Sequence, residues 1–272
     1  MLKKIFALTL AVLMLCACFT ACDNKKPAED TPKAATLASV KKAGKLVIAT
    51  SPDFPPFEEL NADGSVTGIE IDILNLICAE LGVTLEIQQM DFDSVLPGIQ
   101  ACKYDVGVSG ISVTPKREKN VKFTAPYCLA AQAIVVLEGS EIKTKADLTG
   151  KKISVQSGTT AESFCLENSY DVSAFKANTD AQTAMISGKV AAWVIDDLTA
   201  AEMVAAYNAG NPEKKLVILD EAMTTEPYAF AFNLESGDLV DEINKILNKL
   251  VTDGTVADIF VKYNAPYTSP VN

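Results

Sequence analysis

The sequence predicts an α/β protein built of two Rossmann-like lobes that are joined by two hinge crossings. Strand-like and helix-like runs alternate along most of the 272 residues, which is typical of mostly parallel sheets covered by helices. This order occurs twice, and Lys45-Leu-Val-Ile-Ala-Thr-Ser51 in the first half resembles Lys151-Lys-Ile-Ser-Val-Gln-Ser157 in the second. Two further apolar runs, residues 130–137 and 228–233, follow the first and the second half. We therefore expect the chain to cross between the lobes twice, which makes a hinge and leaves a cleft.

The first half contains strands and helices in alternation. Residues 45–50 are mostly apolar and predict a buried strand. Residues 69–81 predict a helix, because apolar residues recur at helical spacing from Leu74 to Leu81 and Gly82 follows them. The other elements of this half are a strand over residues 83–88, a short helix over 93–101 and a strand over 105–109.

The second half repeats this order and adds a strand. We expect strands over residues 152–155, 172–175, 190–195 and 216–219, and helices over 160–167, 180–186 and 198–207. Two helices over residues 238–250 and 255–263 end the chain. Lobe 1 then comprises residues 41–131 and 227–272, and lobe 2 comprises residues 132–226. Ligands of such sheets bind beyond the carboxyl ends of the strands, so the loops after the strands should face the cleft.

The N-terminus is predicted to be a lipoprotein signal peptide of residues 1–21. Two lysines precede the apolar run 5–15, which is too short to span a bilayer. Small residues precede Cys22 and a polar stretch follows it, so we expect Cys22 to be lipidated. Cys18 is the alternative lipidated residue, and an ordinary secretory signal is the alternative kind of signal. Residues 23–36 carry no apolar period, and we expect residues 22–40 to form a flexible tether. The signal and the lipidated cysteine place the protein outside the cytoplasm and anchored to the cell membrane.

Charge and composition exclude several classes of protein. The chain has 35 acidic and 24 basic residues and a net charge of −11, which becomes −13 once the two basic residues Lys3 and Lys4 leave with the signal. A nucleic-acid-binding protein normally carries a basic face, so no nucleic acid is expected as a partner. The chain contains no histidine, which excludes catalytic and metal sites built on that residue. We expect no metal and no cofactor.

Four cysteines lie beyond the signal: Cys78, Cys102, Cys128 and Cys165. A compartment outside the cytoplasm permits disulfides, but the spacing is irregular and contains no CxxC pair. Cys78 and Cys165 fall within apolar helical patterns, which favours buried free thiols. The sequence leaves open whether any of the four form a disulfide.

Arg117 is the only arginine of the chain. The other 23 of the 24 basic residues are lysines, so a single guanidinium calls for a specific reason. Its planar fork can bind a carboxylate through two parallel hydrogen bonds, which an ammonium group cannot do. The residue lies in the loop after the predicted strand 105–109, where we expect the cleft. The structural alternative is an ion pair inside its own lobe.

Asp196 follows the corresponding strand of the second half. An acid at this place suits an ammonium group, and the alternative is a cap for the helix that follows. The Gly158-Thr159-Thr160 turn opens another predicted helix, whose N-terminus attracts anions, although plain capping is the simpler explanation. Phe54 stands in a loop stiffened by prolines and is placed to wall a pocket. An anion site and a cation site that face each other across a cleft suit a zwitterion such as an α-amino acid.

Taken together, these motifs resemble the bacterial extracellular solute-binding proteins of the polar amino acid type (family 3), which have the type II periplasmic-binding fold. The resemblance covers roughly residues 40–264, and it is specific only as a set. The motifs that carry it are Ile48-Ala-Thr-Ser-Pro-Asp-Phe-Pro-Pro-Phe-Glu58, Gly68-Ile-Glu-Ile-Asp72, Met90-Asp-Phe-Asp93, Ser109-Gly-Ile-Ser-Val-Thr-Pro-Lys-Arg117, Gly158-Thr-Thr160 and Ile195-Asp196.

The resemblance implies how the two charged ends of an amino acid are held. Arg117 would bind the α-carboxylate, with help from the backbone N–H groups of Ser112 and Thr160. Asp196 would bind the α-ammonium group, together with the Gly110 carbonyl and the Ser112 hydroxyl.

The resemblance also implies where the ligand side chain lies. Phe54 and Phe92 would flank it, and Gln156 would face it. Members that bind cationic side chains tend to carry an acid where this chain has Ser51, so we expect a ligand with a neutral side chain. The complete set of expected ligand-binding residues is Arg117, Asp196, Ser112, Gly110, Thr160, Phe54, Phe92, Ser109, Gln156, Thr159 and Ser51.

The function that the resemblance implies is a monomeric receptor that delivers its amino acid to an ABC permease in the membrane and is not an enzyme. The alternative is a cyclohexadienyl dehydratase-like enzyme on the same fold, which would use a carboxylic acid in the cleft as general acid. Such an enzyme needs no clasp for an α-ammonium group. The presence of both Asp196 and Ser112 therefore argues against it.

Overall fold

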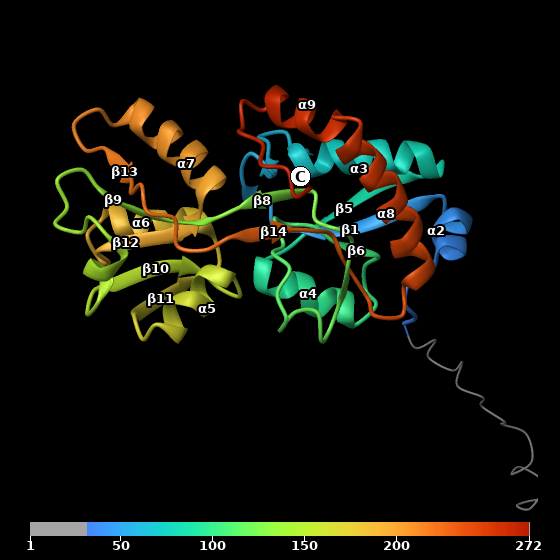
Figure 1. The fold of residues 1–272 in the computed structure, drawn as a ribbon, viewed down its shortest axis with the longest axis horizontal. Coiled ribbons are helices and arrows are strands. Elements are labelled where there is room, and N and C mark those ends of the chain that lie inside the picture. The colour runs from blue at the N-terminus through green and yellow to red at the C-terminus, as the bar shows by residue number, and fades with distance from the viewer. Residues whose placement is uncertain (1–31, 272) are drawn as a thin grey trace, which may run out of the picture. The chain divides into compact units, whose positions relative to one another are not determined.

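The computed structural model describes residues 32–271 and contains two five-stranded sheets. We call the part built on the first sheet lobe 1 and the part built on the second sheet lobe 2. The predicted α/β fold with two lobes is confirmed (Figure 1). The predicted signal peptide, with Cys18 and Cys22, lies outside the described residues. Among residues 32–271, no helix is both long and apolar enough to cross a bilayer.

The sheet of lobe 1 has the strand order β5-β1-β6-β15-β7. Strand β1 (Lys45–Thr50) pairs in parallel with β5 (Thr84–Gln89) and β6 (Val106–Gly107). Strand β15 (Ala231–Phe232) pairs antiparallel with β6 and with β7 (Lys122–Phe123). Because β15 comes after all of lobe 2 in the sequence, the returning chain completes the first sheet.

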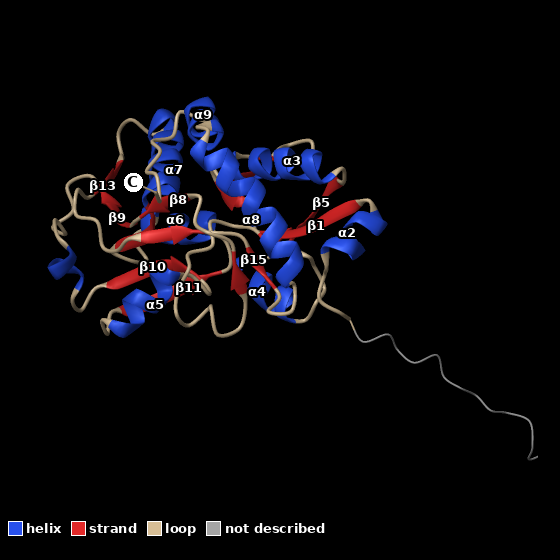
Figure 2. Ribbon diagram, turned by 45° about the vertical axis from the view of Figure 1, so that its right-hand side comes forward, coloured by secondary structure: helices blue, strands red, loops and turns tan. Residues whose placement is uncertain are grey.

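Helices cover both faces of this sheet (Figure 2). Helix α3 (Ile69–Leu81) has the predicted bounds and buries Ile73, Leu74 and Ile77, and the amide of Gly82 caps it with φ 72°. It packs against the C-terminal helices α8 (Gly237–Thr252) and α9 (Thr255–Lys262). Helix α4 (Phe92–Gln100) packs against β1, β6 and β15. Both faces of the sheet are thus removed from water, as its apolar strands require.

Helix α2, the strands of a small sheet and strand β7 of lobe 1 were not predicted. Helix α2 (Leu37–Ala43) lies in part within the segment 22–40 that we expected to be a tether, and its Val40 is buried against the core. A small antiparallel sheet of β2 (Asp53–Phe54), β3 (Glu58–Leu60) and β4 (Val66–Thr67) forms where we expected a loop. The strands are two or three residues long, which is too short for an alternating pattern to reveal.

Lobe 2 repeats this plan with the strand order β11-β10-β12-β9-β13. Its strands are β9 (Gln132–Leu137), β10 (Lys152–Gln156), β11 (Asp171–Phe175), β12 (Ala192–Asp196) and β13 (Leu216–Ile218). Its helices are α5 (Thr160–Glu167), α6 (Asn178–Ile186) and α7 (Asp197–Gly210), together with the short 3₁₀ helix η1 (Lys145–Leu148). Strand β10 pairs in parallel with β11 and β12, and β9 runs antiparallel to β12. Residues that follow β10 and β12 therefore emerge at the same edge of the sheet.

The lobes are joined by a two-stranded antiparallel sheet of β8 (Cys128–Ala130) and β14 (Glu226–Tyr228), which runs between them in Figure 1. The predicted apolar run 130–137 divides into the end of β8 and the lobe 2 strand β9, and the run 228–233 divides into the end of β14 and β15. Each run thus contributes to the connection and to a sheet. The four cysteines within residues 32–271 are free thiols.

Candidate functional site

Ten of the eleven expected ligand-binding residues line one pocket between the lobes. In this closed state the cavity itself is small, about 10 Å³. Its lining comprises Phe54, Phe92, Ser109, Gly110, Ser112, Arg117, Gln156, Thr159, Thr160 and Asp196. Lobe 1 supplies the first six of these residues, and lobe 2 supplies the other four.

Arg117 reaches across the boundary between the lobes. Its Nη1 atom donates to the Ser112 carbonyl in lobe 1 at 2.9 Å, and its Nη2 atom donates to the Gly158 carbonyl in lobe 2 at 3.1 Å. Both acceptors are neutral, and Arg117 belongs to none of the ion pairs among the described residues. Burial lowers the pKa of Arg117, although a guanidinium stays charged in proteins. The site therefore holds a cation without a bound anion.

Two backbone N–H groups lie in the same pocket without an acceptor. The amides of Ser112 and Thr160 donate to no group among residues 32–271, and Ser112 is almost fully buried. Thr159 caps helix α5, because its hydroxyl accepts from the amide of Glu162 at 3.2 Å. Capping thus accounts for Thr159 and leaves the Thr160 amide unpaired. Buried N–H groups are nearly always paired in proteins, so the Ser112 amide points to an acceptor from outside the chain, and the half-buried Thr160 amide lines the same pocket.

Asp196 is a buried carboxylate that faces the same pocket. It ends β12, is 6 % exposed, and accepts a hydrogen bond from the Tyr228 hydroxyl. Burial raises the pKa of Asp196 to about 7, the negative charge of Glu226 adds to that shift, and the hydrogen bond from Tyr228 opposes it. No lysine or arginine of the described residues forms an ion pair with it. A cation placed next to Asp196 would stabilise its charged form.

The walls of the pocket are aromatic. The guanidinium carbon of Arg117 lies 5.6 Å from the ring centroid of Phe92. Gly110 has φ 53°, and a Cβ atom at this position would lie 2.4 Å from Cε1 of Phe54. Only glycine therefore lets the loop after β6 approach the Phe54 ring so closely.

Two expected ligand contacts are used differently. Ser51 does not line the pocket; its hydroxyl donates to Asp53 at 2.9 Å, and its amide donates to the Ser109 hydroxyl at 3.2 Å. Gln156 lines the pocket, but its amide nitrogen donates to both carboxylate oxygens of Asp53 at 3.3 and 3.2 Å and to the Lys176 carbonyl at 3.0 Å. Its oxygen accepts from Asn178 at 3.0 Å. The polar atoms of Gln156 thus connect the lobes.

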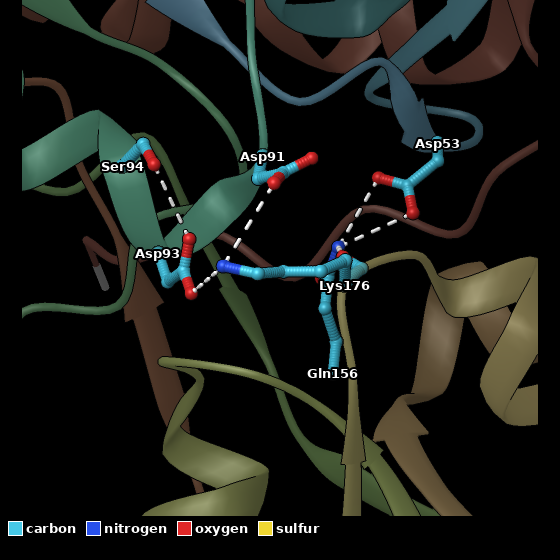
Figure 3. Close-up of polar contacts among 6 residues, drawn as sticks. All are labelled: Asp53, Asp91, Asp93, Ser94, Gln156 and Lys176. Carbon is cyan, nitrogen blue, oxygen red and sulfur yellow. Dashed lines mark hydrogen bonds and ion pairs between the residues drawn. The ribbon is translucent and has the colours of Figure 1, made fainter.

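A second connection between the lobes lies beside the first (Figure 3). The Lys176 ammonium group of lobe 2 contacts Asp93 of lobe 1 and lies 3.8 Å from Asp91. The backbone amide of Asn178 in lobe 2 donates to the Asp53 carboxylate at 2.7 Å. Asp53, Asp91 and Asp93 of lobe 1 thus bind lobe 2 directly in this structure, and the lobes are closed upon each other.

Sequence reasoning missed three polar residues near the pocket. The Tyr228 hydroxyl of β14 donates to Asp196, and Gln132 of β9 donates to the Thr160 hydroxyl at 3.2 Å. Glu226 of β14 is 4 % exposed and lies near both Arg117 and Asp196. All three lie in the segments that join the lobes or follow the joint. Nothing in the sequence marks them, because the apolar runs there indicated only a hinge.

The chain is similar to one family of known proteins and to several individual proteins. The model of the family "Bacterial extracellular solute-binding proteins, family 3" matches residues 46–266. The ABC transporter arginine-binding protein 1 of Escherichia coli (strain K12) is 30% identical over 242 residues, which cover 83% of this chain and 95% of that protein.

Two solved structures are also similar. A mutant of ArgBP from T. maritima has a TM-score of 0.77 and 35% identity, and the match covers 84% of this chain and 98% of that one. An ancestral arginine-binding protein bound to glutamine has a TM-score of 0.75 and 36% identity, and the match covers 82% and 99% of the two chains. The curated names describe binding proteins, so the comparisons do not favour the dehydratase alternative.

We expect Tyr228→Phe to raise the pKa of Asp196 by roughly one unit. The substitution removes a hydrogen bond to the charged carboxylate, which is worth about 1.5–3 kcal/mol in other proteins. The measurement is a pH titration of ¹³C-labelled aspartate carboxyl signals in the protein without ligand.

Because the folded-state pKa of Asp196 lies above its unfolded value, its stabilising contribution is present at low pH and is lost as the pH rises through about 7. In Tyr228→Phe this loss should occur at higher pH, whereas Tyr207→Phe serves as the control. An unchanged Asp196 titration would show that the hydroxyl does not hold the carboxylate.

Proposed function

Because the chain belongs to the bacterial extracellular solute-binding proteins, family 3, we propose that it binds one amino acid between its lobes and delivers it to an ABC importer. The observation that carries this proposal is the pair of unneutralised groups in one small pocket. Neither Arg117 nor Asp196 forms an ion pair with any residue that the structure describes, and both face the same space. Relatives named for amino acids support the class of ligand.

The two charged ends of the amino acid would bind to Arg117 and Asp196. The α-carboxylate would accept from Arg117 and from the amides of Ser112 and Thr160. The α-ammonium group would donate to Asp196, to the Gly110 carbonyl and to the Ser112 hydroxyl. Each buried group would then gain a partner of opposite charge or of matching hydrogen-bonding type.

Closure of the lobes follows from the same contacts. Arg117 belongs to lobe 1 and Asp196 to lobe 2, so a zwitterion bound to both brings the lobes together. The contacts of Asp53 with Gln156 and Asn178 add to the closed state. The ligand would shift the population of the monomeric receptor towards the closed form, which would dock on the permease.

We also propose that the ligand has a neutral, polar side chain. Asp196 is the only carboxylate among the residues that line the pocket, and the ammonium group occupies it. Asp53 lies nearby, but Ser51, Gln156 and Asn178 already donate to its carboxylate. A cationic side chain would thus lack a free anion in this closed pocket. The ancestral arginine-binding protein solved with glutamine makes glutamine the natural neutral probe and arginine the competitor.

Membrane attachment through a lipid on Cys22 completes the proposal. The receptor would then stay outside the cytoplasm close to the permease. The sequence around this residue supports it, with small residues before and a polar stretch after.

Arg117→Lys should weaken binding of the preferred amino acid about 100-fold. Lysine keeps the charge but cannot form two parallel hydrogen bonds to a carboxylate, and the lost bonds involve charged groups. Isothermal titration calorimetry measures the affinity, and emission of Trp193, the sole tryptophan, gives a second signal. Lys116→Ala is the matched control, because this exposed neighbour does not line the pocket. Equal affinity of Arg117→Lys and the unmodified protein would remove the assigned role.

A thermal-shift screen of the twenty amino acids, cystine and ornithine should identify the side chain. At 100 times its dissociation constant, a ligand stabilises by about 2.7 kcal/mol, or roughly 5–10 °C for a protein of this size. We expect glutamine to raise the melting temperature more than arginine, lysine or ornithine does. A larger shift with arginine would contradict a neutral side chain while leaving the amino acid site in place.

Cys22→Ser should release the protein from the membrane of the cells that make it. Loss of the lipidated residue removes the proposed anchor, whereas Cys18→Ser should leave the protein attached. Fractionation of cells followed by mass spectrometry of the mature N-terminus measures both the attachment and the modification. Release by Cys18→Ser instead would assign the lipid to that residue.

A further inference from the structure

Two glutamates lie completely buried beneath the loop that carries Ser109 and Gly110. Glu58 lies in β3 and Glu70 lies in the first turn of α3. Both side chains point into the core and are 0 % exposed. Neither forms an ion pair with a lysine or arginine of the described residues. Two carboxyl groups without a cation in a protein core are costly unless at least one carries a proton.

The hydrogen bonds of Glu70 are those of a carboxylate anion. Its Oε1 atom accepts from the Tyr127 hydroxyl at 2.7 Å, and its Oε2 atom accepts from the Gly110 amide at 3.0 Å. Both oxygens thus have donors. A proton on Glu70 would compete with one of these two bonds.

The hydrogen bonds of Glu58 differ. Its Oε1 atom accepts from the Ser109 hydroxyl at 2.6 Å, but its Oε2 atom has no donor among the described residues. A proton on Oε2 would turn this atom into a donor. Glu70 is the neighbouring carboxylate, because its backbone amide donates to the carbonyl of Phe57 at 3.1 Å and α3 packs on β3. Burial, followed by the charge of Glu70, raises the pKa of Glu58 well above its usual value. Burial raises the pKa of Glu70 as well, against the opposing hydrogen bonds from Glu58, Tyr127 and Gly110.

We propose that Glu58 and Glu70 share one proton, carried by Glu58, and that this pair is a positioning device for the ligand-binding loop. Glu58 holds the Ser109 hydroxyl and Glu70 holds the Gly110 amide, so consecutive residues of the loop are tied to one protonated pair. Gly110 keeps its φ of 53° against Phe54, and its carbonyl is an acceptor assigned to the ammonium group of the ligand. The effect of the pair on affinity rests on the proposed amino acid function, whereas the location of the proton does not.

Other titratable groups around the pair are few. Asp53 adds negative charge near Glu58, and the Tyr127 hydroxyl and the Cys128 thiol lie near Glu70. Burial holds the pKa of Tyr127 and of Cys128 well above their usual values, so both stay neutral at physiological pH. The protonation of the glutamates therefore dominates the change of charge in this part of the core.

The test compares Glu58→Gln with Glu58→Ala and Glu70→Gln. Glutamine at position 58 imitates a protonated glutamate, because its amide nitrogen can donate to Glu70 and its oxygen can accept from Ser109. Glutamine at position 70 replaces one of the two acceptor oxygens with an NH2 group. Either the Gly110 amide or the Tyr127 hydroxyl then loses its acceptor. Melting temperatures without ligand should fall by roughly 5–10 °C in Glu58→Ala and in Glu70→Gln. Glu58→Gln should instead keep the stability that is lost in Glu58→Ala.

The pH dependence gives a readout that a purely structural role would not change. A glutamate whose pKa is raised by folding stabilises fully below its unfolded pKa of about 4.5 and loses this contribution as the pH rises towards the folded value. The melting temperature of Glu58→Gln minus that of the unmodified protein should therefore increase between pH 5 and pH 8. Glu59→Gln, at the exposed neighbouring position, should show no such trend.

Affinity for glutamine and arginine is measured on the same variants. Glu58→Ala and Glu70→Gln should weaken binding at least tenfold, and Glu58→Gln should rescue the affinity lost in Glu58→Ala. Equal damage by the two glutamine variants, failure of Glu58→Gln to fold, or a flat pH difference would each overturn the shared proton. If neither amino acid binds the unmodified protein, the proposed function fails, while the melting curves still decide where the proton lies.

Discussion

The structure depends on two opposite charges that are held apart in one buried space. Asp196 is buried and Arg117 is half-buried, and neither forms an ion pair with another of residues 32–271. Removing an unpaired charge from water costs free energy, and other parts of the fold offset that cost. Such an arrangement is stable only because each group keeps weaker neutral partners, the Gly158 carbonyl for one and the Tyr228 hydroxyl for the other.

The sheet that joins the lobes supplies the partner of Asp196. Tyr228 lies in β14, in the sheet that joins the lobes, and its ring contacts Phe57 with centroids 5.2 Å apart. The same residue therefore belongs to the joint, to the aromatic core of lobe 1 and to the hydrogen-bonding partners of Asp196. A rotation of one lobe about this joint changes the surroundings of Asp196 and the separation between the two halves of the pocket at once.

Sequence reasoning reached the fold and most of the pocket, and its limits have physical causes. The periodicity of α3 and the apolar strand β1 are strong local signals, so their predicted bounds agree with the structure. The site residues came from motifs after strands and from the resemblance to a family. The hydrogen bonds of Ser51 and Gln156 to Asp53 were not predicted, because a sequence does not place these three residues together. The buried pair of Glu58 and Glu70 lies twelve residues apart in the chain and becomes adjacent only when β3 packs on α3.

The late arrival of β15 has a consequence for biosynthesis. Residues 132–218 contain every strand of the lobe 2 sheet, whereas the lobe 1 sheet needs β15 at 231–232. Chains emerge from the ribosome N-terminus first, and domains generally fold as units. Lobe 2 can thus assemble while the earlier lobe still exposes an unfilled gap between β6 and β7.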